Sequence, residues 1–388
     1  MPLDWNHLFP PGEPVIALPS WRHPRLLLSA RRLEQRWRDS DFYRAQRIRA
    51  RIYRQMLRLR AAARVAEVRI ARGSDWILPK FLSGLVDSPQ PPSIWIGTPC
   101  SSQKWTIRVP DASGKAAAFV KWGCSESACR RIVHEHSILC ALPKGLGPQP
   151  LRVGPLGEAM ALCLRPIDGQ PLHRHAPGTS ARLANLLAGL VNHAPLPIDE
   201  HPGFADLATD APAPVRTWME QLSDHSWPVV LRHGDLAPWN LVEVSADDRG
   251  SEGRLIALDW EYGSLRGVWL LDAAYYHLQI AGLLKKLGPE RAVALTVRQL
   301  MRQPWPGLSQ RHAEALTALT AYAAWRRAMC DGDGAEEQRQ QWHRTIWDRP
   351  PSVRRGTAAS MSLIPAFVRS TADSAARWAR FKQKRVDT

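Results

Sequence analysis

Two hydrophobic periods occupy separate parts of this chain, and that separation limits its possible folds more than any other feature. Between residues 94 and 164, apolar and polar residues alternate over short segments, a pattern typical of β-strands. Beyond residue 180 the apolar residues recur mainly at helical spacing. We therefore expect an α+β protein, in which a small antiparallel sheet lobe is joined to a larger, mainly helical lobe.

The predicted elements can be placed from their periods and from the turn residues between them. Strands are expected at 94–97, 104–109, 116–121, 151–153 and 159–164, with a helix at 125–142 that ends before Pro143. Further helices are expected at 180–191, 215–222, 273–286, 290–302 and 313–329. A β segment between residues 229 and 261 interrupts this helical part.

Positive charge is concentrated near the N-terminus. The chain has 388 residues and a formal net charge of +16, and residues 21–72 contain sixteen arginines against four acidic residues. Residues 170–330 are balanced, with fifteen basic and sixteen acidic residues. We therefore expect a basic, largely helical extension at 1–88, a sheet lobe at 89–168, a helical lobe at 169–335 and a basic helical tail at 336–388.

The basic extension is expected to contain an amphipathic helix. Apolar residues recur at the spacing of one helix face at Ile48, Ile52, Met56 and Leu59. Five arginines form a separate stripe, namely Arg44, Arg47, Arg51, Arg54 and Arg58. The favoured interpretation is a solvated helix face, the helix being packed on a neighbouring domain. Contact with an anionic membrane surface is the second alternative and nucleic acid the least favoured partner.

Cysteine usage and hydropathy indicate a protein of the cytoplasm. The six cysteines form no Cys-x-x-Cys pair, and the first residues lack the basic and apolar regions of a secretory leader. No apolar run approaches the roughly 20 residues that cross a bilayer. We expect free thiols in a reducing compartment. The protein is then soluble or, if the arginine stripe binds lipid, peripheral to the inner membrane face.

The candidate chemistry lies in the β segment. Residues 229–242 have the pattern of a strand, a polar turn and a second strand, and residues 255–258 form an apolar strand that leads to Asp259. Asp235 and Asn240 lie five residues apart in the turn. Asp259 would reach the same point if its strand pairs beside residues 241–244. Oxygen ligands of this kind suit Mg²⁺, which takes one or two protein groups together with phosphate oxygens.

These residues carry a resemblance to a known family. His233-Gly-Asp-Leu-Ala-Pro-Trp-Asn240, followed by Asp259-Trp-Glu261, is similar to the catalytic and metal loops of the aminoglycoside phosphotransferase and choline kinase group, within the protein-kinase-like superfamily. The resemblance covers about residues 92–330 and implies a two-lobed protein-kinase-like fold. It implies that Asp235 takes the proton of an acceptor hydroxyl. It also implies that Asn240 and Asp259 hold Mg²⁺ on the nucleotide phosphates.

The same family requires a lysine at the end of the third strand and a glutamate in the next helix. Both are present: Lys121 would hold the α- and β-phosphates as a catalytic group, and Glu135 would pair with its ammonium. The usual Gly-x-Gly-x-x-Gly loop is replaced by Gly97 and the hydroxyls of Ser101 and Ser102, which would cover the phosphates. Arg165 to Ile167 is expected to be the interlobe hinge, whose backbone meets the purine of ATP or GTP.

The acceptor is expected to be a small molecule that carries a hydroxyl. Only 13 residues separate Asp259 from Asp272, too few for a peptide-binding activation segment, and Asp272 is expected to be a helix N-cap. Aminoglycosides are polycations, and the balanced charge of residues 170–330 gives no acidic excess to bind them. A sugar, a lipid-linked glycan or another alcohol is therefore favoured over an aminoglycoside or choline. The basic segment suggests a link with surface polysaccharide assembly.

Two readings from other classes stay open. A pseudokinase scaffold would keep the fold without the chemistry, although Lys121, Glu135, Asp235, Asn240 and Asp259 are all retained. A protein that binds membranes or nucleic acid through its basic helix would show strongly salt-dependent binding.

Overall fold

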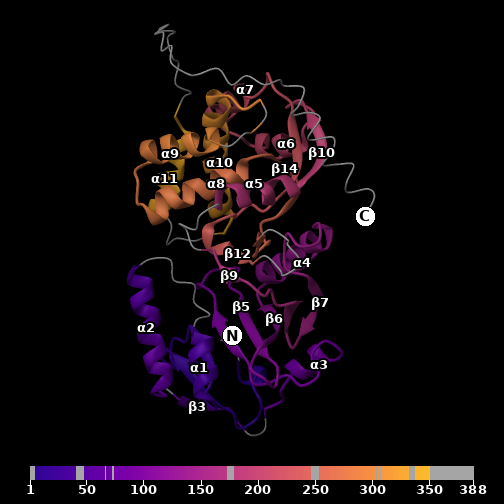
Figure 1. Ribbon diagram of the computed structural model, residues 1–388, viewed down its shortest axis with the longest axis vertical. Helices are drawn as coiled ribbons and strands as arrows, with labels where there is room; N and C mark the ends of the chain where they lie inside the picture. The colour runs from indigo at the N-terminus through magenta and orange to yellow at the C-terminus, as the bar shows by residue number, and fades with distance from the viewer. Residues whose placement is uncertain are drawn as a thin grey trace. The chain divides into compact units, whose positions relative to one another are not determined.

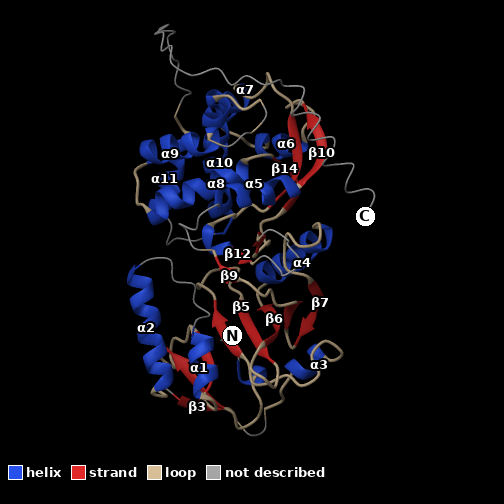
Figure 2. Cartoon of the chain, in the orientation of Figure 1, coloured by secondary structure: helices blue, strands red, loops and turns tan. Residues whose placement is uncertain are grey.

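The N-terminal residues and the predicted sheet lobe form one antiparallel sheet. The computed structural model describes residues 5–40, 48–65, 67–71, 74–172, 179–245, 253–302, 305, 307–331 and 337–349. Contacts divide the chain into a unit of residues 1–351 and a second unit, 352–388, which lies outside the described residues. In the described part, the strand order of the main sheet is β3-β1-β2-β4-β5-β6-β8-β7. These strands are red in Figure 2.

The strands of the sheet lobe lie where the alternating pattern predicts them. They are β4 (Ser93–Ile96), β5 (Trp105–Pro110), β6 (Ala116–Gly123), β7 (Pro150–Leu156) and β8 (Ala159–Leu164). Helix α4 (Glu126–Ala141) follows β6 and begins where the Ser125 hydroxyl accepts a hydrogen bond from the Ala128 amide at 3.1 Å. Such a cap stabilises a helix by about 1 kcal/mol. The predicted two-lobed α+β fold is confirmed.

The first 88 residues differ from the expected largely helical extension. Three strands, β1 (Pro14–Leu18), β2 (Leu26–Ser29) and β3 (Glu67–Arg69), extend the main sheet, and β2 pairs with β4. Leu8, Phe9 and Val15 are fully buried in the same hydrophobic core as residues of β5 and β6. The sequence did not reveal these strands because they have only three to five residues, and β1 and β2 are buried almost throughout rather than on alternate residues. The boundary at residue 88 stays a prediction.

The arginine-rich helix is present, but its apolar face points outward. Helix α2 (Ile48–Ala62) lies beside α1 (Leu33–Asp39) and packs on β1 through Leu57 and Ala61 (Figure 1). Ile52, Met56 and Leu59 keep exposed fractions of 58%, 54% and 65%. The first 88 residues also contain three short helices, namely η1 (Trp5–Leu8), α1 and α3 (Leu78–Leu82).

The arginine stripe of α2 is only partly solvated. Arg51 is exposed, whereas Arg54 and Arg58 are half-buried, and the Arg58 guanidinium lies 5.0 Å from the centre of the Trp37 ring. Arginine stems can pack on apolar surface while their charged ends stay near water. This explains how Arg54 and Arg58 are more buried than Met56. Arg44 and Arg47 lie outside the described residues.

The larger lobe is mainly helical, as expected, and contains two small antiparallel sheets. Its helices are α5 (Thr179–Gly189), α6 (Pro202–Ala208), α7 (Ala213–Glu220), α8 (Leu271–Gln279), α9 (Pro289–Met301), α10 (Gln310–Asp331) and α11 (Glu337–Trp347), with a π-helical turn η4 (Ile280–Leu284) after α8. One sheet has the order β10-β11-β14, from β10 (Val191–Leu196), β11 (Trp227–Arg232) and β14 (Ser264–Val268). The other has the order β13-β12-β9, from β9 (Gln170–Pro171), β12 (Leu241–Val244) and β13 (Arg254–Ala257), with η3 (Pro238–Asn240) before β12.

The core of this lobe lies between α8, α10 and the two small sheets. Trp227, Trp260 and Tyr322 are among its largest buried side chains, and α11 adds Ile346 and Trp347. The predicted tail at 336–388 therefore begins with a helix that packs on α10, while residues 350–388 lie outside the described residues. Among the described helices, none is both long and apolar enough to cross a bilayer.

Candidate active site

Lys121 is held between acidic residues of both lobes. It lies on β6, and its Nζ donates to Glu135 Oε1 and Oε2 at 2.6 and 2.7 Å, and to Asp259 Oδ1 at 2.6 Å. Glu135 lies on α4, is fully buried, and also accepts a hydrogen bond from the Trp260 amide at 3.0 Å. These bonds fix the direction of the ammonium and tie the sheet lobe to the segment after β13.

The charges in this cluster stabilise one another. Burial alone would lower the pKa of Lys121, but the neighbouring charges of Asp259 and Glu135 raise it above its ordinary value. Burial would likewise raise the pKa of Asp259, but the charges of Lys121 and Lys104 hold it below the usual range of an aspartate. Both groups are therefore charged near neutral pH. The ammonium of Lys121 could bind an anion such as a phosphate, and the carboxylate of Asp259 could bind a cation.

Strand pairing brings Asp259 to Asn240, as the sequence predicted. β12 pairs with β13, with Leu241 opposite Ala257, and the Leu258 amide donates to the Asn240 carbonyl at 2.8 Å. Asp259 has a φ of 68°, in the left-handed region, which costs a non-glycine residue about 1 kcal/mol. The strained backbone turns the side chain toward the cleft instead of continuing the strand.

The loop before Asp235 is fixed by Asp272 and His233. Asp272 Oδ2 and Oδ1 accept hydrogen bonds from the amides of His233 and Gly234, at 2.6 and 2.9 Å. The Asp235 amide donates to His233 Nδ1 at 3.1 Å, so the proton lies on Nε2, which donates to the Leu258 carbonyl at 2.7 Å. His233 thus joins this loop to the Asp259 segment. The expectation that Asp272 is a helix N-cap was wrong: α8 begins after Leu270, and Asp272 lies in its first turn.

Gly234 has a conformation that other residues rarely adopt. Its φ is 80°, and a Cβ atom at this position would meet the carbonyl oxygen of Tyr262. Glycine therefore allows the Tyr262 backbone to approach the Asp235 loop closely.

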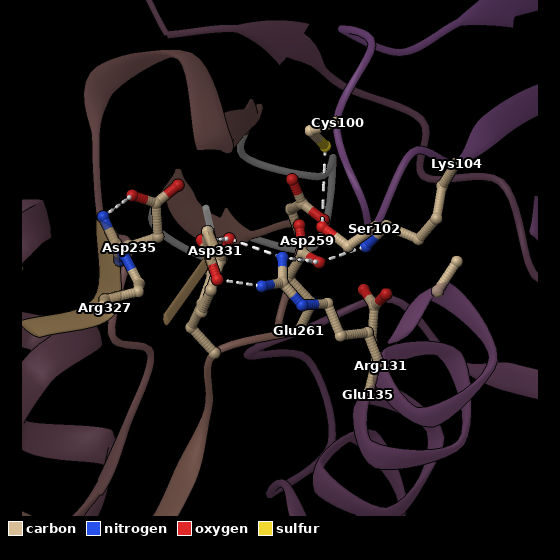
Figure 3. A network of polar contacts seen from close by, with 12 residues as sticks. Cys100, Ser102, Lys104, Arg131, Glu135, Asp235, Asp259, Glu261, Arg327 and Asp331 are labelled. Carbon is tan, nitrogen blue, oxygen red and sulfur yellow. Dashed lines mark hydrogen bonds and ion pairs between the residues drawn. The ribbon is translucent and has the colours of Figure 1, made fainter. Parts of the chain in front are cut away.

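The Asp235 carboxylate is held from three directions, and two of its partners were not predicted. Asn240 Nδ2 donates to Oδ2 at 3.0 Å, the Tyr275 hydroxyl to Oδ1 at 2.6 Å, and Arg327 Nη2 to Oδ1 at 3.0 Å. Arg327 also donates to the Gly234 carbonyl and lies 4.4 Å from the centre of the Tyr262 ring. Figure 3 shows Arg327 reaching Asp235 from α10. Burial opposes the charge of Arg327, but Tyr275 and Asp235 raise its pKa.

A cavity of about 720 Å³ brings most of the predicted site residues together. Gly97, Ser102, Lys121, Arg165, Ile167, Asn240 and Asp259 line it. Ser101 is directed elsewhere: its hydroxyl donates to the Asp331 carbonyl at 3.1 Å. The N-terminal segment also contributes to the wall, through Arg38 and Asp39 of α1, and Asp39 accepts a bond from Arg108 at 2.8 Å.

A second polar cluster in the wall of this cavity joins the lobes. Arg131 of α4 forms an ion pair with Asp331 of α10 and donates to the Tyr262 hydroxyl at 2.6 Å. Lys104, the residue before β5, pairs with Glu261, to which Arg131 also donates at 3.3 Å (Figure 3). We call Lys104, Arg131, Glu261, Tyr262 and Asp331 the interlobe bridge. Burial and the charge of Asp259 raise the pKa of Glu261.

The residues present fit a magnesium ion bound through phosphate oxygens. Asn240 uses its amide nitrogen on Asp235, which leaves Oδ1 for another partner, and Asp259 uses only Oδ1 on Lys121. Both side chains line the cavity, so one amide oxygen and one carboxylate oxygen are available there. Mg²⁺ is commonly bound by one or two protein groups with water and phosphate oxygens. Within the described residues, no cluster of three or more His, Cys, Asp or Glu side chains offers a different metal site.

The unpredicted residues share one property: each is a charged or phenolic side chain on a helix or loop far along the chain from its partner. Arg327 and Asp235 are 92 positions apart, and Arg131 and Asp331 are 200 apart. One signal was available in the sequence. Arg326 and Arg327 interrupt an otherwise apolar stretch of α10, where unpaired charges would be costly.

Comparison with known proteins gives structural likeness but no sequence family. No protein-family model and no curated protein matches the chain. The solved structure of an ethanolamine kinase from Plasmodium vivax is 12% identical, with 66% of this chain and 82% of that chain covered and a TM-score of 0.43. A thermostable aminoglycoside phosphotransferase mutant, in ternary complex with ADP and hygromycin B, is 13% identical, with 70% and 96% covered and a TM-score of 0.43.

Proposed function

We propose that this protein is a kinase that transfers the γ-phosphate of ATP, or of GTP, to a hydroxyl group of a small molecule. One observation carries the proposal. Lys121 and Glu135 lie 100 or more residues before the Asp235–Asn240 loop, yet their cluster with Asp259 meets this loop, and Lys121, Asn240 and Asp259 line one cavity between the two lobes. A lysine, a pair of oxygen ligands and a separate carboxylate are the groups that phosphoryl transfer needs.

Each group has a distinct task in this proposal. Lys121 would neutralise charge on the α- and β-phosphates, and the magnesium ion, held by Asn240 and Asp259, would supply charge neutralisation on the phosphates of the bound nucleotide. The acceptor oxygen attacks the γ-phosphorus while the bond from that phosphorus to the β-bridging oxygen breaks, which leaves ADP. The acceptor proton passes to Asp235. Its Oδ2 accepts only the Asn240 hydrogen bond among the described residues, so a lone pair remains for that proton.

A direct assay tests the proposal. Purified protein is supplied with ATP labelled at the γ-position, Mg²⁺ and a panel of alcohols that includes sugars, cell-envelope glycan precursors, choline and aminoglycosides. We expect labelled product with at least one acceptor, and the label should disappear when Mg²⁺ is chelated. If no nucleotide is turned over under any condition while the protein remains folded and binds nucleotide, the pseudokinase alternative is correct.

We also propose that α2 binds an anionic membrane surface, because its exposed face combines apolar and basic side chains. Ile52, Met56 and Leu59 are all more than half exposed, and Arg51 is exposed beside them. A helix that presents both kinds of residue suits the boundary between lipid head groups and acyl chains. Sedimentation with anionic vesicles at low salt tests this. Serine at Ile52 and Leu59 should reduce binding, whereas Met301→Ser, at an exposed apolar position of α9, should not. Equal binding by both variants, or none by the wild type, contradicts the membrane proposal.

A further inference from the structure

A second cavity lies inside the helical lobe, next to the loop that carries Asp235. Its volume is about 280 Å³, slightly below the range of about 300–1,000 Å³ common for pockets that enclose a whole drug-sized ligand. Its walls come from α6, β11, β14 and α10. It can therefore accept one end of a ligand. We call it the arginine pocket, because Arg232, Arg266, Arg326 and Arg327 line it.

The acidic residues near this pocket do not balance its four guanidinium groups. Asp206 also lines the pocket but is exposed. Arg326 Nη1 donates to the backbone carbonyl of Asp206 at 2.8 Å, and its guanidinium lies 5.7 Å from the centre of the Tyr322 ring. Among the described residues, no carboxylate lies within ion-pair distance of Arg266 or Arg326. Arg266 is exposed and Arg326 is half-buried, and an anion in the pocket would give both guanidinium groups an ionic partner.

The other two arginines have only partial compensation. Arg232 Nε lies 3.8 Å from Asp272 Oδ1, too far for a good hydrogen bond, and this nitrogen is buried without a hydrogen-bond partner. Asp272 is already occupied by two backbone amides. Burial lowers the pKa of Arg232, Asp272 opposes that effect, and the positive charges of Arg327 and Arg326 lower it further. An anion placed among these groups would remove the repulsion and supply the missing hydrogen-bond acceptor.

The arginine pocket is adjacent to the residues that hold Asp235. Arg327 lines the pocket and donates to the Asp235 carboxylate, and Gly234, the residue before Asp235, forms another part of the wall. Tyr262 lines both this pocket and the larger cavity that contains Lys121 and Asp259. A molecule bound in the arginine pocket would therefore lie against Gly234 and Arg327, the residues next to Asp235 in the sequence and in space.

We propose that the arginine pocket binds an anionic group, a phosphate or a carboxylate, carried by the acceptor whose hydroxyl is phosphorylated at Asp235. The acceptor is then an alcohol with a negatively charged group, such as a sugar phosphate or a hydroxy acid. This rests on the proposed function. The overall charge of the helical lobe bears only on neutral sugars against cationic alcohols. The four arginines of the pocket indicate, in addition, an anionic group on the acceptor.

A matched panel of acceptors tests the proposal. Phosphate transfer from ATP is measured for alcohols that carry a phosphate or a carboxylate, for the same alcohols without that group, and for amino sugars of similar size. We expect kcat/KM for the anionic member of a pair to exceed that of the neutral member by about 10- to 100-fold, the effect of hydrogen bonds to a charged group. Equal or better transfer to the neutral or amino compounds overturns it.

Variants of the pocket connect the preference to its residues. Arg326→Gln and Arg266→Gln should each reduce the ratio of kcat/KM for anionic over neutral acceptors by about tenfold or more, through KM of the anionic acceptor. Arg326→Lys, which keeps the charge, should restore part of the preference. Arg266 makes no side-chain hydrogen bond within the described part of the chain, so its variant is expected to fold even if Arg326→Gln does not. Arg298→Gln, at an exposed position of α9, is the control and should leave the ratio unchanged. An unchanged ratio in both pocket variants overturns the assignment.

Inorganic sulfate separates an acceptor group from a free anion and does not depend on catalysis. Sulfate should raise the unfolding temperature of the wild-type protein more than that of Arg326→Gln or Arg266→Gln, and it should compete with the anionic acceptor. If sulfate instead accelerates transfer to a neutral alcohol, the pocket holds a free anionic effector and the acceptor assignment fails. Failure of the proposed function is distinguishable, because it appears as absent phosphate transfer to every acceptor.

Discussion

The two clusters of charged side chains around the cleft are built in opposite ways. The Lys121 cluster joins both lobes and places two carboxylates, of Glu135 and Asp259, on one ammonium. The Asp235 cluster lies entirely within the helical lobe and places one carboxylate among Arg327, Tyr275 and Asn240. In the proposed mechanism, the first cluster offers a carboxylate oxygen of Asp259 to the cation that accompanies the nucleotide. The second has donors that hold a single carboxylate in one direction.

Because the two clusters differ in this way, substitutions in them should have different effects. A change in the Lys121 cluster should act first on nucleotide binding, because its charges face the cavity between the lobes. A change at Asp235, Tyr275 or Arg327 should act first on the rate of the chemical step, because these side chains do not line the cavity that contains Lys121. Four predictions test this contrast.

The largest effect is expected at Asp235. Asp235→Asn removes the group that takes the acceptor proton, so kcat should fall by about 10²–10⁴-fold, the usual contribution of a general base. Nucleotide affinity, measured by titration calorimetry, should change little. Asp210→Asn, in an exposed turn whose positive φ asparagine tolerates, is the matched control. A variant at Asp235 that keeps wild-type kcat would remove it from the proposed mechanism.

Asp259 and Lys121 should show the other half of the contrast. Asp259→Ala loses a charged oxygen ligand, and the affinity for the magnesium–nucleotide complex should fall by about 10- to 100-fold. Lys121→Ala should raise KM for the nucleotide and lower kcat together, since the ammonium contacts the phosphates before and during transfer. The comparison requires titrations with and without Mg²⁺. If Asp259→Ala binds the nucleotide as the wild type does, Asp259 is not a metal ligand.

Arg327 should have a smaller effect of the same kind as Asp235. Arg327→Gln removes the ion pair to Asp235 and the bond to Gly234, so the carboxylate is less well oriented, and kcat should fall by about tenfold. Arg327→Lys should recover little of this, because a lysine cannot reproduce the two-pronged contact. Steady-state kinetics on the folded variants measure the effect, and a pure KM change for the nucleotide would contradict this positioning role.

The smallest effect is expected in the acid stability of the protein. The folded-state pKa of Asp259 lies below its unfolded value, so this carboxylate stabilises the fold above about pH 4 and the contribution is lost as the pH falls further. Its side chain is 40% exposed, so solvent screening limits the contribution to about 1 kcal/mol. Denaturant unfolding of the wild type and of Asp259→Asn between pH 7 and 3 measures this. The difference between the two should shrink at low pH, and a constant difference would contradict it.

The sequence was most informative where chemistry depends on short-range order. Asp235 and Asn240 are five residues apart in one turn, and strand pairing brings Asp259 to Asn240. Lys121, near the end of β6, and Glu135, in α4, were placed by the family resemblance, which requires a lysine in the third strand and a glutamate in the next helix.

Contacts between distant elements could not be predicted in this way. Tyr275 and Arg327 meet Asp235 only because α8 and α10 pack together, and no spacing rule relates these helices to the β11 loop. The outward face of α2 has a similar explanation. Periodicity identified an apolar stripe, but the sheet contacts Leu57 and Ala61, and burial is decided by what the helix meets.

The interlobe bridge limits how the two lobes can move. Arg131 and Lys104 of the sheet lobe form ion pairs with Asp331 and Glu261 of the helical lobe, and the Ser101 hydroxyl donates a hydrogen bond to the Asp331 carbonyl. The two lobes can move apart here only when these ion pairs break. Dissolved salt screens the parts of the pairs that face water and should therefore make that movement easier.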